Sequence, residues 1–177
     1  MASLEHVFLE FSAAKLRQYL ERIHACLERL DEEQVWRRPS EASNSIGNLC
    51  LHLSGNVRQW ILHGIGGEPD VRRRDAEFAA RGGAVKAELL ARLGETVRLA
   101  CGLLESLPPE RLLETTRPQN YEVTVLEAIY RVVEHFSGHT GQIIAATKAM
   151  TGADLGFYRH LSGAAGPPPP PAGHEIP

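Results

Sequence analysis

The chain has 177 residues, 43% of them hydrophobic and only 6% aromatic, which suits one domain with a core built mainly from Leu, Ala and Val. Its formal net charge of −3 argues against a general nucleic-acid binder, because such proteins need clustered Lys and Arg to neutralise phosphates. The N-terminus lacks the basic and then apolar order of a signal peptide, and no apolar run approaches the roughly 18 residues of a transmembrane helix, so we expect a cytoplasmic protein with no membrane partner.

Four stretches have the periodicity of amphipathic helices, and almost nothing alternates as a strand would. The first covers about residues 4–30, and a polar segment follows it. The second begins near Ser43 or Ser45, either of which could cap a helix, and continues to His63 before a group of glycines. A polar crossing over residues 68–83 then leads to the third helix.

The third helical stretch covers about residues 84–107 and ends at two prolines. The fourth has the clearest start, because Thr124 and Glu127 have the spacing of a capping box, and it ends near Gly152. Four helices of comparable length predict an all-α fold, a four-helix bundle. The long crossing between the second and third helices indicates that the connectivity is not simply up-down-up-down.

We assign residues 1–162 to the bundle domain and residues 163–177 to a Pro-rich C-terminal tail. The tail contains five consecutive prolines, Pro167 to Pro171, and cannot bury a core. We expect it to be extended as polyproline II or mobile, and a role as a proline-motif ligand is the alternative.

His52 in the second helix and His135 and His139 in the fourth are the candidate metal ligands. His135 and His139 are four residues apart, so their imidazoles point the same way from successive turns, at a spacing that suits one ion. Helical geometry places both at the edge of the buried face, and it places His52 on a polar stripe beside Leu49 and Leu53. If the two helices face each other here, three imidazoles meet and leave one position of a tetrahedral ion open for water or substrate.

The spacing alone also permits a histidine cluster without a metal, because H-x-x-x-H pairs occur by chance and core-facing histidines are often satisfied by ordinary hydrogen bonds. His63 lies on the same stripe as His52 but too far along the helix to share an ion. Cys50 points away from His52 and is interpreted as a core thiol, and the run Arg72-Arg73-Arg74 as a solvated turn that could alternatively hold an anionic group. Three widely spaced cysteines without a C-x-x-C pair indicate neither a disulfide framework nor a thiolate zinc site. The remaining histidines are assigned to the surface or the tail: His6, His24, His160 and His174.

Two segments resemble the DinB/YfiT-like family of metalloenzymes: SIGNLCLHL, from Ser45 to Leu53, and EHFSGHTGQI, from Glu134 to Ile143. The likeness covers roughly residues 4 to 160, and the crossing RDAEF, which includes Glu77, is similar to one branch of uncharacterised members. The resemblance implies a four-helix bundle whose three histidines bind a divalent ion, nickel or zinc in many members, often in a homodimer. Characterised relatives include thiol-dependent S-transferases, an isomerase that uses a low-molecular-weight thiol, and metal-dependent hydrolases.

From the residues and the resemblance together we expect a metal-dependent thiol S-transferase that acts on a small-molecule substrate, with a low-molecular-weight thiol as co-substrate. Gln142, Asn56 and Asn48 would orient ligands or water near the ion. Glu77 could fold over the mouth of the site, and the candidate catalytic residues are Gln142, Asn56 and Glu77. No carboxylate lies on either histidine stripe, which favours thiol transfer over hydrolysis. The alternatives are a metal-dependent hydrolase and a non-catalytic bundle in which a metal supports the fold or a dimer.

Overall fold

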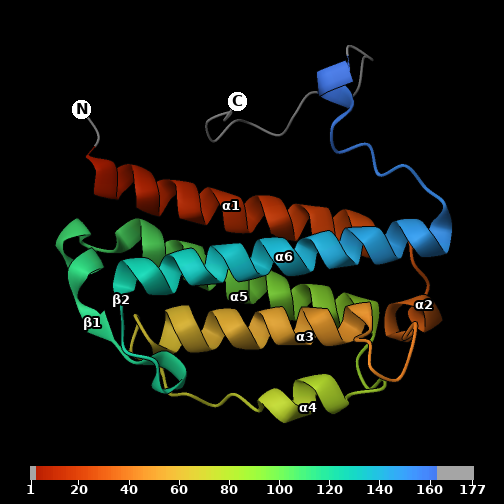
Figure 1. Ribbon diagram of the computed structural model, residues 1–177, viewed down its shortest axis with the longest axis horizontal. Helices are drawn as coiled ribbons and strands as arrows, with labels where there is room; N and C mark the ends of the chain where they lie inside the picture. The colour runs from red at the N-terminus through yellow and green to blue at the C-terminus, as the bar shows by residue number, and fades with distance from the viewer. Residues whose placement is uncertain (1–2, 163–177) are drawn as a thin grey trace.

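The computed structural model describes residues 3–162, and four long helices run side by side along the long axis of the molecule (Figure 1). These helices are α1 (Leu4–Leu27), α3 (Ile46–Val57), α5 (Lys86–Ser106) and α6 (Val125–Thr151). α1 packs against α5 and α6, and α3 packs against the same two helices, so α1 and α3 occupy opposite corners of the bundle. The predicted all-α four-helix bundle is therefore confirmed.

The core contains the apolar faces that the sequence predicted. Side chains with at most 1% exposure come from all four helices and include Leu16, Leu53, Leu93 and Phe136. Their removal from water supplies the main driving force for folding. Within residues 3–162, no helix combines the length and the apolar character needed to cross a membrane.

The two helices that carry the candidate ligands begin at capping boxes. The Oγ of Ser45 accepts a hydrogen bond from the backbone N–H of Asn48 at 3.0 Å, and the Oδ1 of Asn48 accepts one from the N–H of Ser45 at 3.1 Å. Thr124 and Glu127 make the same reciprocal pair at the start of α6, as predicted. At the other end of α6, Gly152 has a left-handed φ of 66°, which glycine adopts at little cost. These signals fix where each helix begins or ends, and hence which way its histidines point.

The connections hold short elements that periodicity did not predict. The first predicted helix ends slightly early, at Leu27, and a separate short helix lies in the polar segment that follows it. α3 continues as a π-helical turn in which the N–H of Gly64 donates to the carbonyl of Gln59, five residues back, at 3.1 Å. The two strands pair antiparallel, with Thr115 opposite Thr124. The additional elements are α2 (Glu32–Trp36), the π-helical turn (Arg58–His63), α4 (Arg74–Ala79), three 3₁₀ turns (Pro109–Leu113, Pro118–Asn120 and Arg159–Ser162), β1 (Thr115–Thr116) and β2 (Val123–Thr124).

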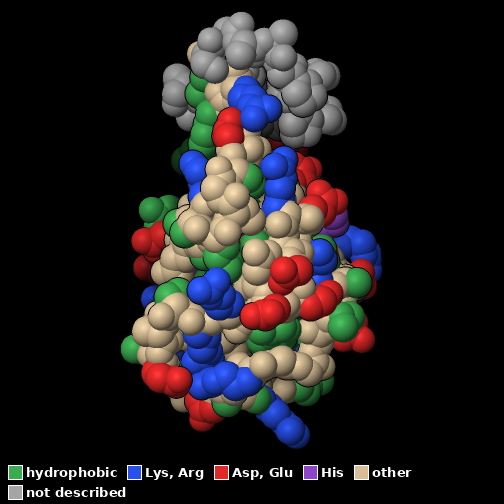
Figure 2. Space-filling view, turned by 90° about the vertical axis from the view of Figure 1, so that its right-hand side faces the viewer, with side chains coloured by type: hydrophobic (Ala, Val, Ile, Leu, Met, Phe, Trp, Pro, Cys, Tyr) green, Lys and Arg blue, Asp and Glu red, His purple; other side chains and the backbone are tan. Residues whose placement is uncertain are grey.

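Acidic and basic side chains are interspersed on the end of the bundle that lies to the right in Figure 1 and faces the viewer in Figure 2. A nucleic-acid interface instead gathers Lys and Arg on one surface. This face therefore lacks the pattern of a nucleic-acid interface. The predicted Pro-rich tail, residues 163–177, lies outside the described residues, so its assignment as a separate segment stays a prediction.

Candidate metal centre

His52 of α3 and His135 and His139 of α6 lie together between the two helices. One ring nitrogen from each lies within 4.8 Å of the others, and the Nε2 atoms of His52 and His135 are 2.8 Å apart. The three ring centroids are 4.4 to 5.1 Å apart, and the rings meet edge to face. The structure thus brings together all three histidines that the sequence singled out, in an arrangement that could bind a divalent ion.

The packing of α3 against α6 places these side chains at the edge of the core. Leu53, which follows His52 directly, and Phe136, which follows His135 directly, are both fully buried. The histidines therefore point to one side of the contact between the helices. The side chain of His52 is only 6% exposed, whereas His135 and His139 are partly buried and retain contact with solvent. An ion held here could still be reached by a small molecule from the side of α6.

A buried ion pair lies behind His52, at the ring nitrogen that faces away from His135. The Oε2 of Glu77 is 3.0 Å from Nδ1 of His52, and Arg72 donates to both carboxylate oxygens of Glu77, from Nε at 2.8 Å and from Nη2 at 2.9 Å. Burial alone would raise the pKa of the Glu77 carboxyl, but the hydrogen bonds from Arg72 and His52 outweigh burial and hold this pKa below its usual range. Glu77 is therefore an ionised carboxylate, and both of its oxygens already have hydrogen-bond partners.

Two sequence-based expectations are corrected by this ion pair. Arg72 was interpreted as part of a solvated turn, yet its side chain is only 3% exposed because the crossing folds it back against Glu77. Glu77 was expected over the mouth of the site, but it lies behind His52 and does not face the space between the histidines. Helical periodicity could not locate either residue, because both precede or belong to the short helix α4 within the crossing.

Gln142 holds His139 from one turn further along α6. The Oε1 of Gln142 lies 2.9 Å from Nδ1 of His139 and accepts its N–H, which leaves the lone pair of His139 on Nε2. Gln142 thus orients a candidate ligand, whereas the sequence suggested that it would orient a bound molecule. Burial lowers the pKa of His139 despite this hydrogen bond, so its imidazole is neutral at neutral pH.

Burial and the neighbouring rings also keep His135 neutral. Desolvation, with smaller contributions from His139 and His52, lowers the pKa of His135 from 6.5 to about 4. Only a neutral imidazole has a nitrogen lone pair to offer a metal. Three close imidazoles, two of them held neutral by their surroundings, fit a divalent ion well.

The two asparagines expected near the ion have different roles. Asn48 is fully buried and serves the fold: its Oδ1 accepts from Arg38 at 2.8 Å, and its Nδ2 donates to the carbonyls of Glu77 and Ala80 at 2.8 and 2.9 Å. It ties the crossing to α3 and has no spare donor for a ligand, so the expectation for Asn48 is wrong. Asn56, one turn after His52, is 8% exposed, and its Oδ1 has no hydrogen-bond partner among the described residues.

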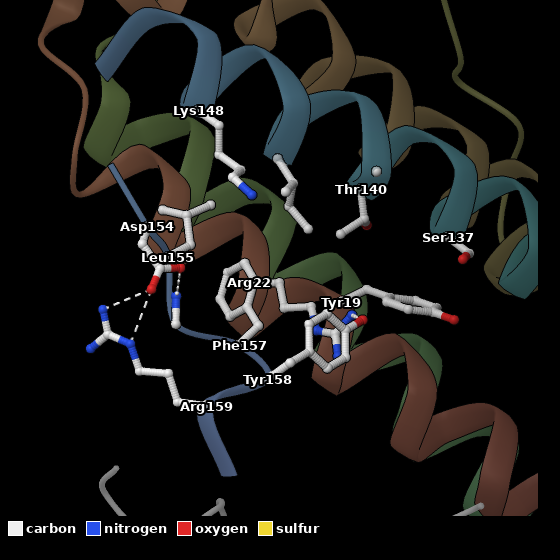
Figure 3. A pocket seen from close by; sticks show the side chains of 13 residues that line it. Tyr19, Arg22, Ser137, Thr140, Lys148, Asp154, Leu155, Phe157, Tyr158 and Arg159 are labelled. Atoms are coloured by element: carbon white, nitrogen blue, oxygen red, sulfur yellow. Dashed lines mark hydrogen bonds and ion pairs between the residues drawn. The ribbon is translucent and has the colours of Figure 1, made fainter. Parts of the chain in front are cut away.

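Other features of the sequence lie away from the histidine cluster. His63 donates from Nδ1 to the carbonyl of Glu68 at 2.6 Å and does not join the three histidines. A cavity of about 530 Å³ lies between α1, α6 and the segment after α6, where it is lined by Arg22, Lys148 and Tyr158 among others (Figure 3). The α6 residues on its wall include Gly141 and Lys148, which lie on the opposite side of the helix from His139. This cavity is therefore separate from the candidate metal centre.

Comparisons with known proteins identify the family of the chain and solved structures with a similar fold. The sequence matches the family described as "Protein of unknown function (DUF1572)" over residues 3–164, and no curated protein matches it. The structure is similar to a conserved protein from Enterococcus faecalis, with a TM-score of 0.67 at 17% identity, covering 81% of this chain and 97% of that one. It is also similar to a DinB-like protein from Bacillus subtilis, YjoA, with a TM-score of 0.64 at 17% identity, covering 83% of this chain and 96% of that one. The expected likeness to DinB-like proteins is confirmed, and the chain belongs to the DUF1572 family.

Proposed function

We propose that the protein binds one divalent metal ion through His52, His135 and His139 and uses it to act on a small molecule. The observation that carries this proposal is the approach of the three rings, with one nitrogen of each within 4.8 Å of the others. Three protein ligands leave at least one position for another molecule, as in catalytic rather than structural sites. Nickel and zinc both suit imidazole ligands, and these are the ions we propose.

An ion bound by three neutral imidazoles keeps its full +2 charge and lowers the pKa of a thiol or a water molecule that it binds. The surrounding residues supply orientation and exclude water. The ring of Phe78 packs on His52 at 4.7 Å, and the guanidinium of Arg74 covers Phe78 at 4.9 Å, which shields one side of the site. Asn56, one turn after His52, stays a candidate because its buried Oδ1 has no hydrogen-bond partner among the described residues and keeps its capacity to accept one.

The reaction that we propose is transfer of a low-molecular-weight thiol to an electrophilic carbon. Hydrolysis would call for a free acid or base beside the ion, and Glu77, the carboxylate bonded to the cluster, already accepts N–H donors from Arg72 and His52. The chain's own thiols are poor nucleophiles, because burial raises the pKa of Cys50 to about 12 and that of Cys101 to about 11. A reacting thiol would therefore come from a co-substrate.

Metal analysis of the purified protein tests the first part of the proposal. After loading with Ni²⁺ or Zn²⁺ and dialysis, we expect one ion per chain, and a sharp loss of occupancy in His52→Ala, His135→Ala and His139→Ala. His63→Ala is the matched control, because His63 lies outside the cluster and should leave occupancy unchanged. Full metal retention in His135→Ala would refute this ligand set.

A thiol-consumption assay tests the reaction. With a panel of low-molecular-weight thiols and electrophiles, turnover should stop on chelation, return with added metal, and fall in His139→Ala while circular dichroism stays unchanged. Metal-dependent ester cleavage without a thiol would favour the hydrolase. Inactivity across both panels would favour a non-catalytic metal site.

We also propose that the protein forms a homodimer. Light scattering of the purified protein measures its mass in solution and tests this proposal.

A further inference from the structure

The ion pair of Arg72 and Glu77 is an unusual feature to find inside a small bundle. Their side chains are 3% and 8% exposed, and removing two charges from water is costly unless hydrogen bonds compensate. The compensation here is complete around the carboxylate: Arg72 donates to both oxygens, and Nδ1 of His52 lies 3.0 Å from Oε2. Arg72 is held in turn by the Oε1 of Gln59, at 2.8 Å from Nη1.

A notch in α3 makes room for this carboxylate. Gly55, one turn after His52, has no side chain, and a Cβ placed there would lie 1.9 Å from Oε1 of Glu77 and 3.0 Å from Nε of Arg72. Its backbone is ordinary α-helix, so the turn does not require glycine. Glycine inside a helix destabilises it relative to alanine. The close approach of Glu77 is the feature at this position that requires a glycine.

The position of the ring proton of His52 determines which of its two nitrogens can bind a metal. Arg72 donates to both oxygens of Glu77, so Oε2 acts as an acceptor, and a lone pair on Nδ1 would face it at 3.0 Å, which is repulsive. Nη2 of Arg72 lies 3.1 Å from the same nitrogen, but its shorter contact is the hydrogen bond that it donates to Oε2 of Glu77 at 2.9 Å. The proton therefore belongs on Nδ1, and the lone pair of His52 is on Nε2, the nitrogen that faces His135.

We propose that Glu77, clamped by Arg72 in the notch at Gly55, is a positioning residue that fixes His52 as the Nδ1-protonated tautomer and presents Nε2 to the metal. The crossing between α3 and α5 thus forms part of the metal centre, although it contributes no ligand. The effect on metal affinity rests on the proposed function. Loss of a hydrogen-bond partner behind a metal-binding histidine typically weakens binding 10- to 100-fold.

Gly55→Ala tests the proposal without changing any ligand or charge, because the new methyl group displaces the carboxylate. Two-bond ¹H–¹⁵N spectra of the metal-free protein at neutral pH should show His52 protonated on Nδ1 in the wild type and a mixture of tautomers in Gly55→Ala. Competition with a chromophoric chelator should show Zn²⁺ binding weakened about 10- to 100-fold. The matched control is Gly102→Ala in α5, where a Cβ meets nothing within 4 Å, and it should change neither measurement.

A second variant covers the case in which Gly55→Ala does not fold. Glu77→Gln keeps the size of the side chain but loses the charge that pairs with Arg72, so it should weaken Zn²⁺ binding by a smaller factor. A wild-type His52 protonated on Nε2, or Zn²⁺ affinity unchanged in both variants, would overturn the proposal. A wild type with the Nδ1 tautomer that binds no Zn²⁺ would contradict the proposed function alone, because the tautomer is measured without metal.

Discussion

The metal-free protein should lose stability as the pH falls from 7.5 to 5, and His135 should account for about 1–2 kcal/mol of that loss. In the unfolded chain His135 has the ordinary pKa of 6.5, whereas burial first, and then the neighbouring rings, lower its pKa to about 4 in the fold. The unfolded state therefore binds more protons between these two values, and protonation favours unfolding. The contribution of His135 is fully present above pH 6.5 and is lost as the pH falls towards 4. Integrating from pH 7.5 to pH 5, at 1.36 kcal/mol per unit, gives about 2 kcal/mol. Because the ring is only half-buried and solvent screens its charge, we expect about 1–2 kcal/mol.

Urea unfolding followed by circular dichroism, in the presence of a chelator, measures this loss. Many carboxylates also begin to titrate near pH 5, so the informative quantity is the difference between the wild type and His135→Gln, which has no titrating group at this position. The wild type should lose about 1–2 kcal/mol more than the variant over this range. Equal losses in the two proteins would show that His135 does not resist protonation in the fold, and the neutral cluster inferred above would be wrong.

Three further predictions rest on the structure, and a fourth, on the tail, rests on the sequence. Gln142→Ala should weaken Zn²⁺ binding about 10- to 100-fold in a chelator competition, because His139 loses the acceptor of its Nδ1 proton; unchanged affinity would mean that this hydrogen bond has no role in binding. Thr124→Ala should lower the free energy of unfolding by about 1 kcal/mol, since it removes the cap of α6, and chemical denaturation would detect the change. Phe136→Ala should cost about 3–5 kcal/mol by the same measurement, because the ring is fully buried; a loss below 1 kcal/mol would contradict the packing of α6. Truncation after Ser162 should leave the melting temperature within a few degrees, and a large drop would mean that the tail packs on the bundle.

The four helices and the histidine cluster were predictable because helical geometry ties side-chain direction to spacing. Four residues between His135 and His139 put both rings on one face of α6, and the polar stripe through His52 matched it from α3. The cap at Thr124 was readable for the same reason, since a capping box is a local pattern. Features that depend on spacing within one helix can be derived from the sequence.

The partners of His52 could not be derived in this way. Arg72 and Glu77 come from the crossing, and no periodic pattern fixes how a connection folds back on a helix. The run of arginines around Arg72 was interpreted as solvated. Its partner, Glu77, lies five residues further along, in the short helix α4, which composition did not predict. One signal was present in the sequence: Gly55 interrupts a buried helix one turn after a candidate ligand. An unexplained helical glycine beside a candidate ligand indicates that another group approaches closely.

For Asn48 the error was the opposite one, because the sequence suggested a role at the site and the structure shows a role in the fold. Its position on the same stripe as His52 suggested a ligand-orienting role, yet it lies three residues after Ser45, the spacing of a capping pair. Its remaining hydrogen bonds hold the crossing in place. A polar residue in the first turn of a helix is more safely interpreted as part of the cap.

Anomalous diffraction from crystals of the Ni²⁺- or Zn²⁺-loaded protein, collected at the absorption edge of the metal, tests the central claim most directly. We predict one strong peak per chain between the rings of His52, His135 and His139, within bonding distance of one nitrogen of each, about 2.0–2.1 Å for zinc. A crystal of fully loaded protein with its metal elsewhere, or without a peak between these rings, would contradict the claim that the three histidines form the metal centre.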